Sequence, residues 1–141
     1  MTHRYIGTKE VTAWAAEKDG KPGYGVKYED GYTSWSPKEV FEDAYRTSEP
    51  GMPQNLTFGD ALHYLKQGKK VAREGWNGKG MFVYMVPAAS YQAQTGVAKS
   101  YFGEGSMVPY QSYMAIKNAN ESVSTWAPSV NDTLSEDWMV L

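Results

Sequence analysis

Apolar and polar side chains alternate at every second position in parts of the first 46 residues, which is the spacing of a strand that buries one face. The alternation is clearest at Tyr24, Val26 and Tyr28, and the Asp30-Gly31 pair after them is a typical hairpin turn. Three short strands are therefore predicted, within residues 9–16, 24–28 and 32–35.

A helix is predicted directly after these strands. Ser36 has the side chain of an N-cap, Pro37 suits the first helical position, and Glu39 completes a capping box. The apolar face of this helix would consist of Val40, Phe41, Ala44 and Tyr45. The pattern thus predicts a β-β-β-α module, which at this size buries little surface by itself.

A polar stretch with two prolines and a glycine, residues 47–55, follows this module. Such a composition does not extend a helix and offers little to bury, so a linker is predicted there. The chain is then expected to consist of an N-terminal module, residues 1–46, and a larger C-terminal module, residues 56–141.

The C-terminal module begins with apolar residues at helical spacing. Thr57 opens the predicted helix as its N-cap and Gly68 ends it. The apolar stripe follows the positions i, i+3, i+4 and i+7 and comprises Phe58, Ala61, Leu62 and Leu65. This spacing predicts an amphipathic helix that packs on a sheet.

Most of the remaining C-terminal module is typical of strands. Residues 81–86 form an unbroken apolar run, which predicts a strand covered on both faces. Residues 87–110 have weak periodicity, and a loop of that length is either functional or contains a further element. Other strands are expected at 70–73, 97–102, about 111–117, 122–126 and 137–141, with a turn or short helix at 129–135. The predicted fold class is α+β with a small, mainly antiparallel sheet.

The composition excludes several kinds of chemistry. The 141 residues include five tryptophans, eleven tyrosines and four phenylalanines but two histidines and no cysteine, so thiolate sites and multi-histidine metal sites are excluded. The formal net charge of −2 offers no electrostatic footprint for long nucleic acid. No apolar run approaches the roughly 20 residues that span a bilayer. We therefore expect a cytoplasmic protein without a metal, a cofactor or a membrane partner.

Carboxylates near the C-terminus are the remaining candidates for catalysis. Asp132, Glu136 and Asp137 lie close together in the sequence, and paired carboxylates can act as general acid and base. Asp132 also stands three residues after Ser129, which is the spacing of a capping box. A structural role for Asp132 is the favoured interpretation, and no residue is predicted to be catalytic.

The five tryptophans fall into two groups. Trp14, Trp35 and Trp138 lie within expected strands and are predicted to be core residues. Trp76 lies in a glycine-rich turn, and Trp126 lies at the end of a strand. A tryptophan beside accessible backbone amides can serve as a platform on which a base stacks. For Trp76 and Trp126, two interpretations therefore remain: binding of a base, and ordinary packing.

Long motifs of the C-terminal module resemble a small phage and prophage family, formerly a domain of unknown function, that includes the second type of Thoeris anti-defence protein. The resemblance covers residues 56–141 and is most specific from Ala72 to Gly80. Its landmarks are Leu56–Leu62, Gly68–Phe82, Glu104-Gly105, Met114–Lys117, Trp126–Ser129 and Asp132–Trp138. The N-terminal module resembles an extension found in phage-encoded relatives.

The resemblance implies a protein that binds a nucleotide signal and does not cleave it. Such proteins hold a cyclic ADP-ribose isomer (glycocyclic ADP-ribose), which bacterial TIR-domain defence proteins make, in pockets between the protomers of a homotetramer. The implied location is the cytoplasm of the host bacterium. The alternatives are another cyclic oligonucleotide signal, a nucleotide-degrading hydrolase acting through Asp132 or Glu136, and a protein-interaction or virion module.

The chemistry of such a ligand assigns a role to the residues in the matching motifs. Trp76 and Trp126 are expected to stack on the base. Polar groups for the pyrophosphate, the riboses or the adenine amine would come from Asn77, the Gly78 N–H, Lys79, Asn131 and Asp132. Three further candidates for the site are Tyr110, Tyr113 and Lys117.

Overall fold

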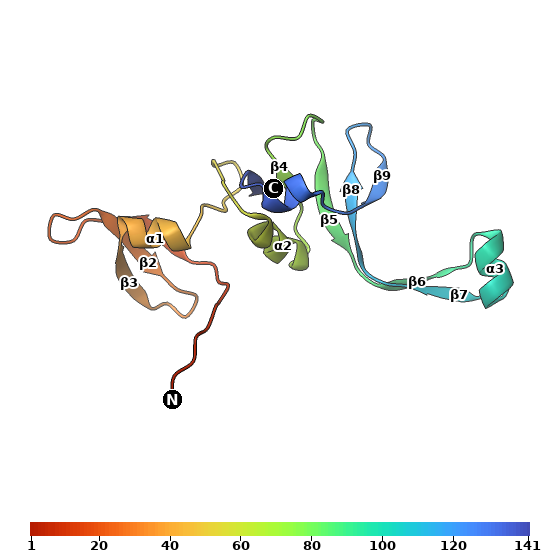
Figure 1. Cartoon of the computed structure of the whole chain (residues 1–141), viewed down its shortest axis with the longest axis horizontal. Coiled ribbons are helices and arrows are strands. Elements are labelled where there is room, and N and C mark those ends of the chain that lie inside the picture. Colours follow the sequence, from red (N-terminus) through yellow and green to blue (C-terminus); the bar gives the residue numbers. More distant parts are fainter. The chain divides into compact units, whose positions relative to one another are not determined.

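Every strand of the computed structural model, which describes residues 1–141, pairs antiparallel with its neighbours. The chain divides into two units, Met1–Arg46 and Thr47–Leu141 (Figure 1). The predicted fold class, α+β with mainly antiparallel sheets, is confirmed. None of the four helices has the length and apolarity needed to cross a membrane.

The N-terminal unit is a three-stranded sheet followed by one helix. Its elements are β1 (Thr12–Ala15), β2 (Gly23–Lys27), β3 (Thr33–Pro37) and α1 (Lys38–Ala44). β2 is the central strand, and Tyr24 stacks on Phe41 of the helix with ring centroids 4.3 Å apart. The helix therefore covers the sheet face that carries Tyr24 and the buried Val26.

The helix begins one residue later than the sequence predicts. Ser36 pairs with Tyr24 in the sheet, and the N-cap is Pro37, whose backbone is extended at ψ 148°. No side chain caps the helix, and the Lys38 N–H donates to the Pro22 carbonyl oxygen at 3.2 Å. The prediction of a Ser36 cap is wrong because strand pairing holds Ser36 in the sheet.

Two tryptophans lie on the sheet face opposite α1. Trp14 and Trp35 both face Gly25 across the strands, one position along from Tyr24. Trp14 is 48% exposed and Trp35 is half-buried, so the prediction that both form the core is wrong. Their rings lie over the bare backbone of Gly25 and Gly23, where any Cβ would collide with them.

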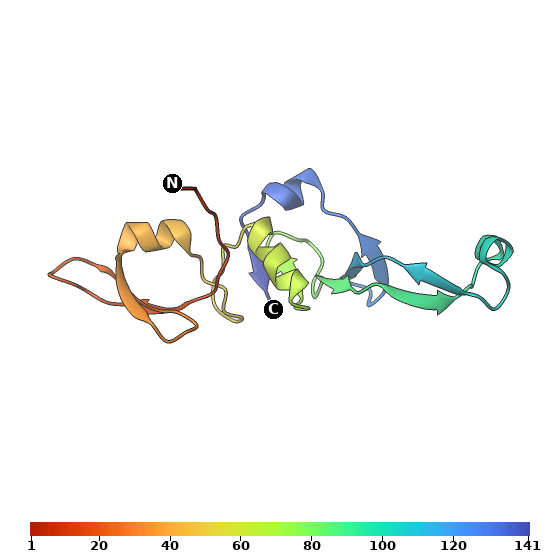
Figure 2. The ribbon, with the colours of Figure 1, turned by 90° about the horizontal axis from the view of Figure 1, so that it is seen from below.

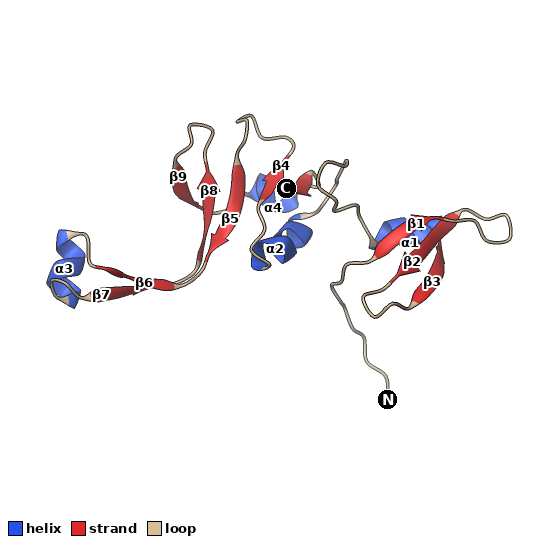
Figure 3. Cartoon of the chain, turned by 180° about the vertical axis from the view of Figure 1, so that it is seen from behind, coloured by secondary structure: helices blue, strands red, loops and turns tan.

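The C-terminal unit is built on a five-stranded sheet with the order β10-β4-β5-β8-β9. Its strands are β4 (Val71–Arg73), β5 (Phe82–Val86), β8 (Tyr113–Lys117), β9 (Val123–Trp126) and β10 (Trp138–Val140). A short helix, α4 (Val130–Leu134), connects β9 to β10 (Figure 3). The last strand pairs antiparallel with β4, which brings the start of β10 beside the loop that follows β4.

The helix α2 (Phe58–Lys66) covers one face of this sheet, as the apolar stripe predicts. Thr57 caps the helix in a complete capping box with Asp60, and Gly68 follows its end at a φ of 83°. Ala61 and Leu65 are fully buried in a core cluster with β4, β5, β8 and β10. Burying one such leucine stabilises the fold by about 1.5–3 kcal/mol.

The central strand β5 is covered on one face only. Val83 is fully buried under α2, whereas Phe82 and Tyr84, which point to the opposite face, are half-buried. The prediction that residues 81–86 are covered on both faces is therefore wrong for a single copy of the chain. We call the second face, with Phe82 and Tyr84, the open face of the sheet.

Residues 87–110, where the sequence pattern is weak, form an arm that extends away from the sheet (Figures 1 and 2). The arm consists of β6 (Ala89–Gln92), α3 (Gly96–Phe102) and β7 (Met107–Tyr110). The pair Val86–Tyr113 of β5 and β8 is followed in the same register by the pair Ala89–Tyr110 of β6 and β7. The arm is thus a continuation of the β5–β8 ribbon.

The segment at the end of the arm is a helix, so the prediction of a strand at 97–102 is wrong. Thr95 is the N-cap of α3, and its side chain accepts a hydrogen bond from the Ala98 N–H at 3.0 Å. The helix has no buried residue, and its Val97 and Tyr101 side chains are each 82% exposed. Without a buried face, its sequence lacks the periodicity that identifies a helix.

Candidate functional site

Four aromatic rings from separate segments of the C-terminal unit meet beside α2. They are Phe58 of α2, Trp76 of the β4–β5 loop, Trp126 at the end of β9 and Trp138 of β10. Trp138 is fully buried, and its ring centroid lies 5.4 Å from those of Phe58 and Trp76 and 6.2 Å from that of Trp126. The prediction that Trp138 is a core residue is confirmed.

Trp76 and Trp126 form the outer part of this aromatic cluster. Their ring centroids are 6.3 Å apart and their planes are nearly perpendicular, at 68°. Both side chains pack against the core and both remain partly exposed. Packing on Trp138 therefore fixes the two rings while leaving part of each accessible.

Asp132, in the first turn of α4, holds the Trp76 ring by a hydrogen bond. It completes a capping box at the start of α4: its N–H donates to Ser129 Oγ at 3.0 Å, and its Oδ2 accepts from the Ser129 N–H at 2.9 Å. Its Oδ1 accepts from Arg73 Nη1 at 2.9 Å and from Trp76 Nε1 at 3.3 Å. The predicted capping box is confirmed, and both carboxylate oxygens are engaged within the chain.

Arg73 links Asp132 to a second carboxylate. Arg73 Nε donates to Asp137 Oδ1 at 2.9 Å, and the Gly75 N–H donates to Asp137 Oδ2 at 2.9 Å. Arg73 and Trp138 are partners in the β4–β10 pairing, which places the guanidinium beside the aromatic cluster. The resulting network of one cation and two anions fixes the start of the loop that carries Trp76.

The network keeps its carboxylates ionised. Burial would raise the pKa of Asp132, but hydrogen bonds from Ser129, Arg73 and Trp76 together lower that pKa below its usual value. The hydrogen bond from Arg73 lowers the pKa of Asp137 against a smaller effect of burial. Hydrogen bonds from Asp137 and Asp132 raise the pKa of Arg73 in turn. A general acid needs the opposite shift, because it must hold a proton near neutral pH.

The loop between β4 and β5 presents three further candidates next to Trp76. The side chains of Asn77 and Lys79 are exposed. Gly78 lies so close to Met81 that a Cβ at this position would collide with the methionine sulfur. Asn131 is exposed on α4, beside Asp132. These residues are neighbours of Trp76 or Asp132 along the chain.

Two of the candidates lie on the open face of the sheet. Met114 pairs with Trp126 and shares its face, so Tyr113 and Lys117 of the same strand point to the other face. Lys117 Nζ pairs with Glu121 at 3.0 Å. Within one copy of the chain, these two side chains and the Trp76–Trp126 pair are on opposite sides of the sheet.

Tyr110 is farther away, on the arm. It is 48% exposed, and its ring centroid lies 5.9 Å from that of Tyr91 on the paired strand β6. The candidates thus fall into three groups, at the aromatic cluster, on the open face and on the arm. A single copy of the chain does not bring the three groups together.

Sequence reasoning missed Arg73, the residue that connects the network. An arginine at the end of a short strand, directly before a glycine-rich turn, was the available signal. Its partners Asp132 and Asp137 are 59 and 64 residues away in the sequence, so no spacing rule relates them to it. No group of three or more histidine, aspartate or glutamate side chains comes together as a metal site.

Comparison with known proteins identifies the family of this small α+β domain. Residues 56–141 match the family model of the Thoeris anti-defense 2-like domain. The chain is also 37% identical over 91 residues to Thoeris anti-defense 2 of Bacillus phage SP01, an alignment that covers 64% of this chain and 99% of the relative. The chain belongs to the Thoeris anti-defense 2-like family, which confirms the resemblance of its motifs.

Proposed function

We propose that this protein counters Thoeris defence by binding a cyclic ADP-ribose-type signal, glycocyclic ADP-ribose, and holding it without cleaving it. Family membership supports the Thoeris system as the target. The observation that carries ligand binding is the Trp76–Trp126 pair, two partly exposed rings fixed against the buried Trp138. Such a pair offers a base an aromatic face without the entropy cost of ordering a mobile side chain.

Asp132 enters this proposal as the residue that orients the platform. Its Oδ1 fixes the indole N–H of Trp76, so the ring is in place before a base arrives. A stacked base contributes about 1–3 kcal/mol. Asn77 and Gly78, which follow Trp76 in the chain, and Asn131, which precedes Asp132, supply donors for the riboses and the pyrophosphate in this proposal.

The charges around the cluster indicate which cation meets a pyrophosphate. Arg73 is already paired with two carboxylates, which leaves the network with a net negative charge. Lys79 is exposed in the loop beside Trp76 and has no such constraint. We therefore assign the pyrophosphate contact to Lys79.

The pocket is completed in this proposal by self-association into a homotetramer. Tyr113 and Lys117 lie on the open face, with the half-buried Phe82 and Tyr84, and Tyr110 lies on the arm. Surfaces of this kind, apolar and uncovered in a single chain, favour contact with another protein surface. A second copy would cover the open face and would bring its own candidates to the aromatic cluster.

Retention of an intact ligand agrees with the chemistry of the carboxylates. Asp132 and Asp137 have lowered pKa values and are paired with Arg73, so neither is prepared to donate a proton to a leaving group. A ligand of roughly 35 non-hydrogen atoms at about 0.3 kcal/mol each reaches a dissociation constant of roughly tens of nanomolar. Binding of this strength, in the host cytoplasm where the signal is made, removes the signal without turnover.

Calorimetric titration of the full chain with glycocyclic ADP-ribose tests this function. We expect saturable binding, weakened about tenfold or more in Trp76→Ala because a stacked base is lost. Trp14→Ala removes a tryptophan from the other unit and is expected to bind like the unchanged protein. Absence of binding to the unchanged protein would reject the proposal, and equal binding by Trp76→Ala would remove Trp76 from the site.

A further inference from the structure

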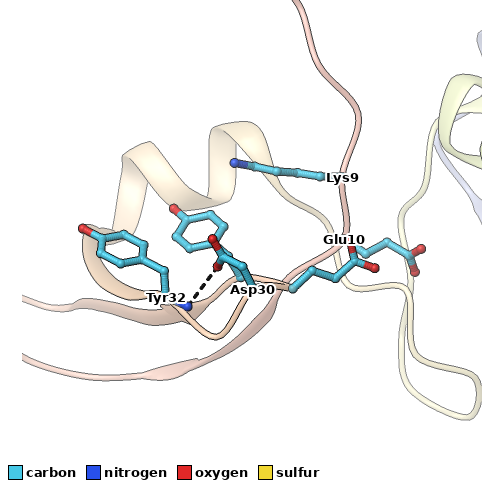
Figure 4. Close-up of a pocket in the computed structure, with 6 residues that line it drawn as sticks. Lys9, Glu10, Asp30 and Tyr32 are labelled. Carbon is cyan, nitrogen blue, oxygen red and sulfur yellow. Dashed lines mark hydrogen bonds between the residues drawn. The ribbon is translucent and has the colours of Figure 1, made fainter.

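The N-terminal unit has a surface hollow of about 540 Å³ at the β2–β3 hairpin (Figure 4). The hollow is lined by Lys9, Glu10, Tyr28, Glu29, Asp30 and Tyr32. All of these residues belong to the first unit, and none takes part in the aromatic cluster around Trp76. The hollow therefore has no role in the proposed nucleotide binding.

Two tyrosine rings form the aromatic wall of the hollow. The centroids of Tyr28 and Tyr32 are 5.8 Å apart, and the ring planes differ by 22°. The hairpin holds both residues: the Tyr28 N–H donates to the Tyr32 carbonyl oxygen at 2.9 Å, and the Tyr32 N–H donates to Asp30 Oδ1 at 2.9 Å. Gly31, at a φ of 89°, makes this tight turn possible. The wall is thus built into the backbone of the hairpin.

Carboxylates also line the hollow. Three carboxylates, on Glu10, Glu29 and Asp30, line the hollow together with the single ammonium of Lys9. The face of a tyrosine ring attracts a cation through the ring quadrupole, and nearby carboxylates add to that attraction. The combination favours an organic cation over an anion or a neutral group.

The chain already places a cation of its own on this wall. Lys9 Nζ lies 4.4 Å from the centroid of the Tyr28 ring, and Figure 4 shows its side chain reaching across the hollow from the segment before β1. Residues 1–10 have no regular secondary structure and are exposed. Because the segment is exposed, the Lys9 side chain can leave the ring at low cost.

We propose that this hollow binds an alkylammonium group, which takes the position of Lys9 on the Tyr28 ring. Two sources share this chemistry: the lysine side chain of a partner protein and a free polyamine. The site is independent of the proposed nucleotide binding, because it lies wholly within the other unit.

An NMR titration of the full-length, ¹⁵N-labelled protein tests this site. The probes are N-acetyl-lysine methylamide, spermidine and the uncharged N-acetyl-norleucine methylamide, at matched ionic strength. We expect saturable shifts of the amide signals of residues 28–32 with the two ammonium probes and none with the norleucine probe. Tighter binding of capped lysine indicates a protein partner, and tighter binding of spermidine indicates a polyamine. Absence of a saturable shift with both ammonium probes would overturn the proposal.

Substitutions separate the aromatic and the electrostatic contributions. Lys9→Gln removes the internal competitor and is expected to tighten binding about fivefold, whereas Tyr28→Leu is expected to weaken it about fivefold. Tyr28→Phe keeps the ring and serves as the matched control for Tyr28→Leu. Glu29→Gln should weaken binding, while Glu17→Gln, outside the hollow, should not. Unchanged affinity in both Tyr28→Leu and Glu29→Gln would also overturn the proposal.

Discussion

Asp132 divides its two carboxylate oxygens between two tasks. Oδ2 accepts from the Ser129 N–H and fixes the start of α4, whereas Oδ1 accepts from Arg73 and from the indole N–H of Trp76. The cap could be predicted from the sequence because Ser129 is only three residues away. The contact with Arg73 could not, because only the pairing of β10 with β4 brings the two together.

Removing the charge of Asp132 should destabilise the C-terminal unit. Asp132→Asn keeps the shape of the side chain but weakens its hydrogen bonds to Arg73, so we expect the free energy of unfolding to fall by about 1–3 kcal/mol. Urea unfolding followed through the NMR signal of the buried Trp138 indole measures this change in the C-terminal unit. Glu136→Gln alters a nearby exposed carboxylate and should change the free energy by less than about 0.5 kcal/mol. Equal losses in the two variants would contradict the role of the network.

The same network predicts how stability depends on pH. The pKa values of Asp132 and Asp137 are lower in the folded state than their ordinary value of 3.8, so the folded protein releases these protons more readily than the unfolded chain. Their stabilising contribution is fully present above that ordinary value and is lost as the pH falls through the lower, folded-state pKa. We expect the free energy of unfolding to decline below about pH 4, and to decline less steeply in Asp137→Asn. Identical pH profiles for the two proteins would count against this account.

The helices α2 and α3 show where element prediction from sequence succeeds and fails. α2 buries Ala61 and Leu65 on one side, so its apolar residues recur with a helical period that the sequence displays. α3 buries nothing, and its sequence pattern wrongly predicts a strand. The strands of the arm were missed for the same reason, because β6 and β7 gain their register from β5 and β8 and bury few side chains.

The difference between these helices gives a matched pair of cap substitutions. Thr57→Ala removes the N-cap of the packed helix α2, so the free energy of unfolding of the C-terminal unit should fall by about 1 kcal/mol. Thr95→Ala removes the equivalent cap of α3, which is not packed on the sheet, and should leave that free energy nearly unchanged. Urea unfolding monitored at the Trp138 indole compares the two. A larger loss in Thr95→Ala would show that α3 supports the sheet.

At the scale of the whole molecule, residues that the sequence motifs assign to one site lie on opposite faces of the sheet. Trp76, Trp126 and Asp132 meet at one face, as their shared assignment to the site requires. Lys117 belongs to another of the family motifs and Tyr113 directly precedes that motif, but both lie on the open face. Local sequence patterns identify a strand without showing which of its faces meets a ligand, and they contain no information about contacts between copies.

Self-association is the property of the whole molecule that the open face predicts. Light scattering of the 15.7 kDa chain at micromolar concentration should report the mass of a tetramer. Tyr84→Glu puts a charge on the open face and should shift the protein to smaller species. Val40→Glu adds the same charge to an exposed position of α1 and serves as the control. A monomer at this concentration would contradict a pocket completed by a second copy.

Heat release of bound ligand tests the central claim, retention of an intact nucleotide signal, most directly. The full chain is incubated with glycocyclic ADP-ribose, freed of unbound material and heat-denatured, and the released compound is identified by chromatography and mass spectrometry. We predict recovery of the intact cyclic compound from the unchanged protein and little or none from Trp76→Ala. Recovery of a cleaved product, or of no nucleotide from the unchanged protein, would contradict sequestration.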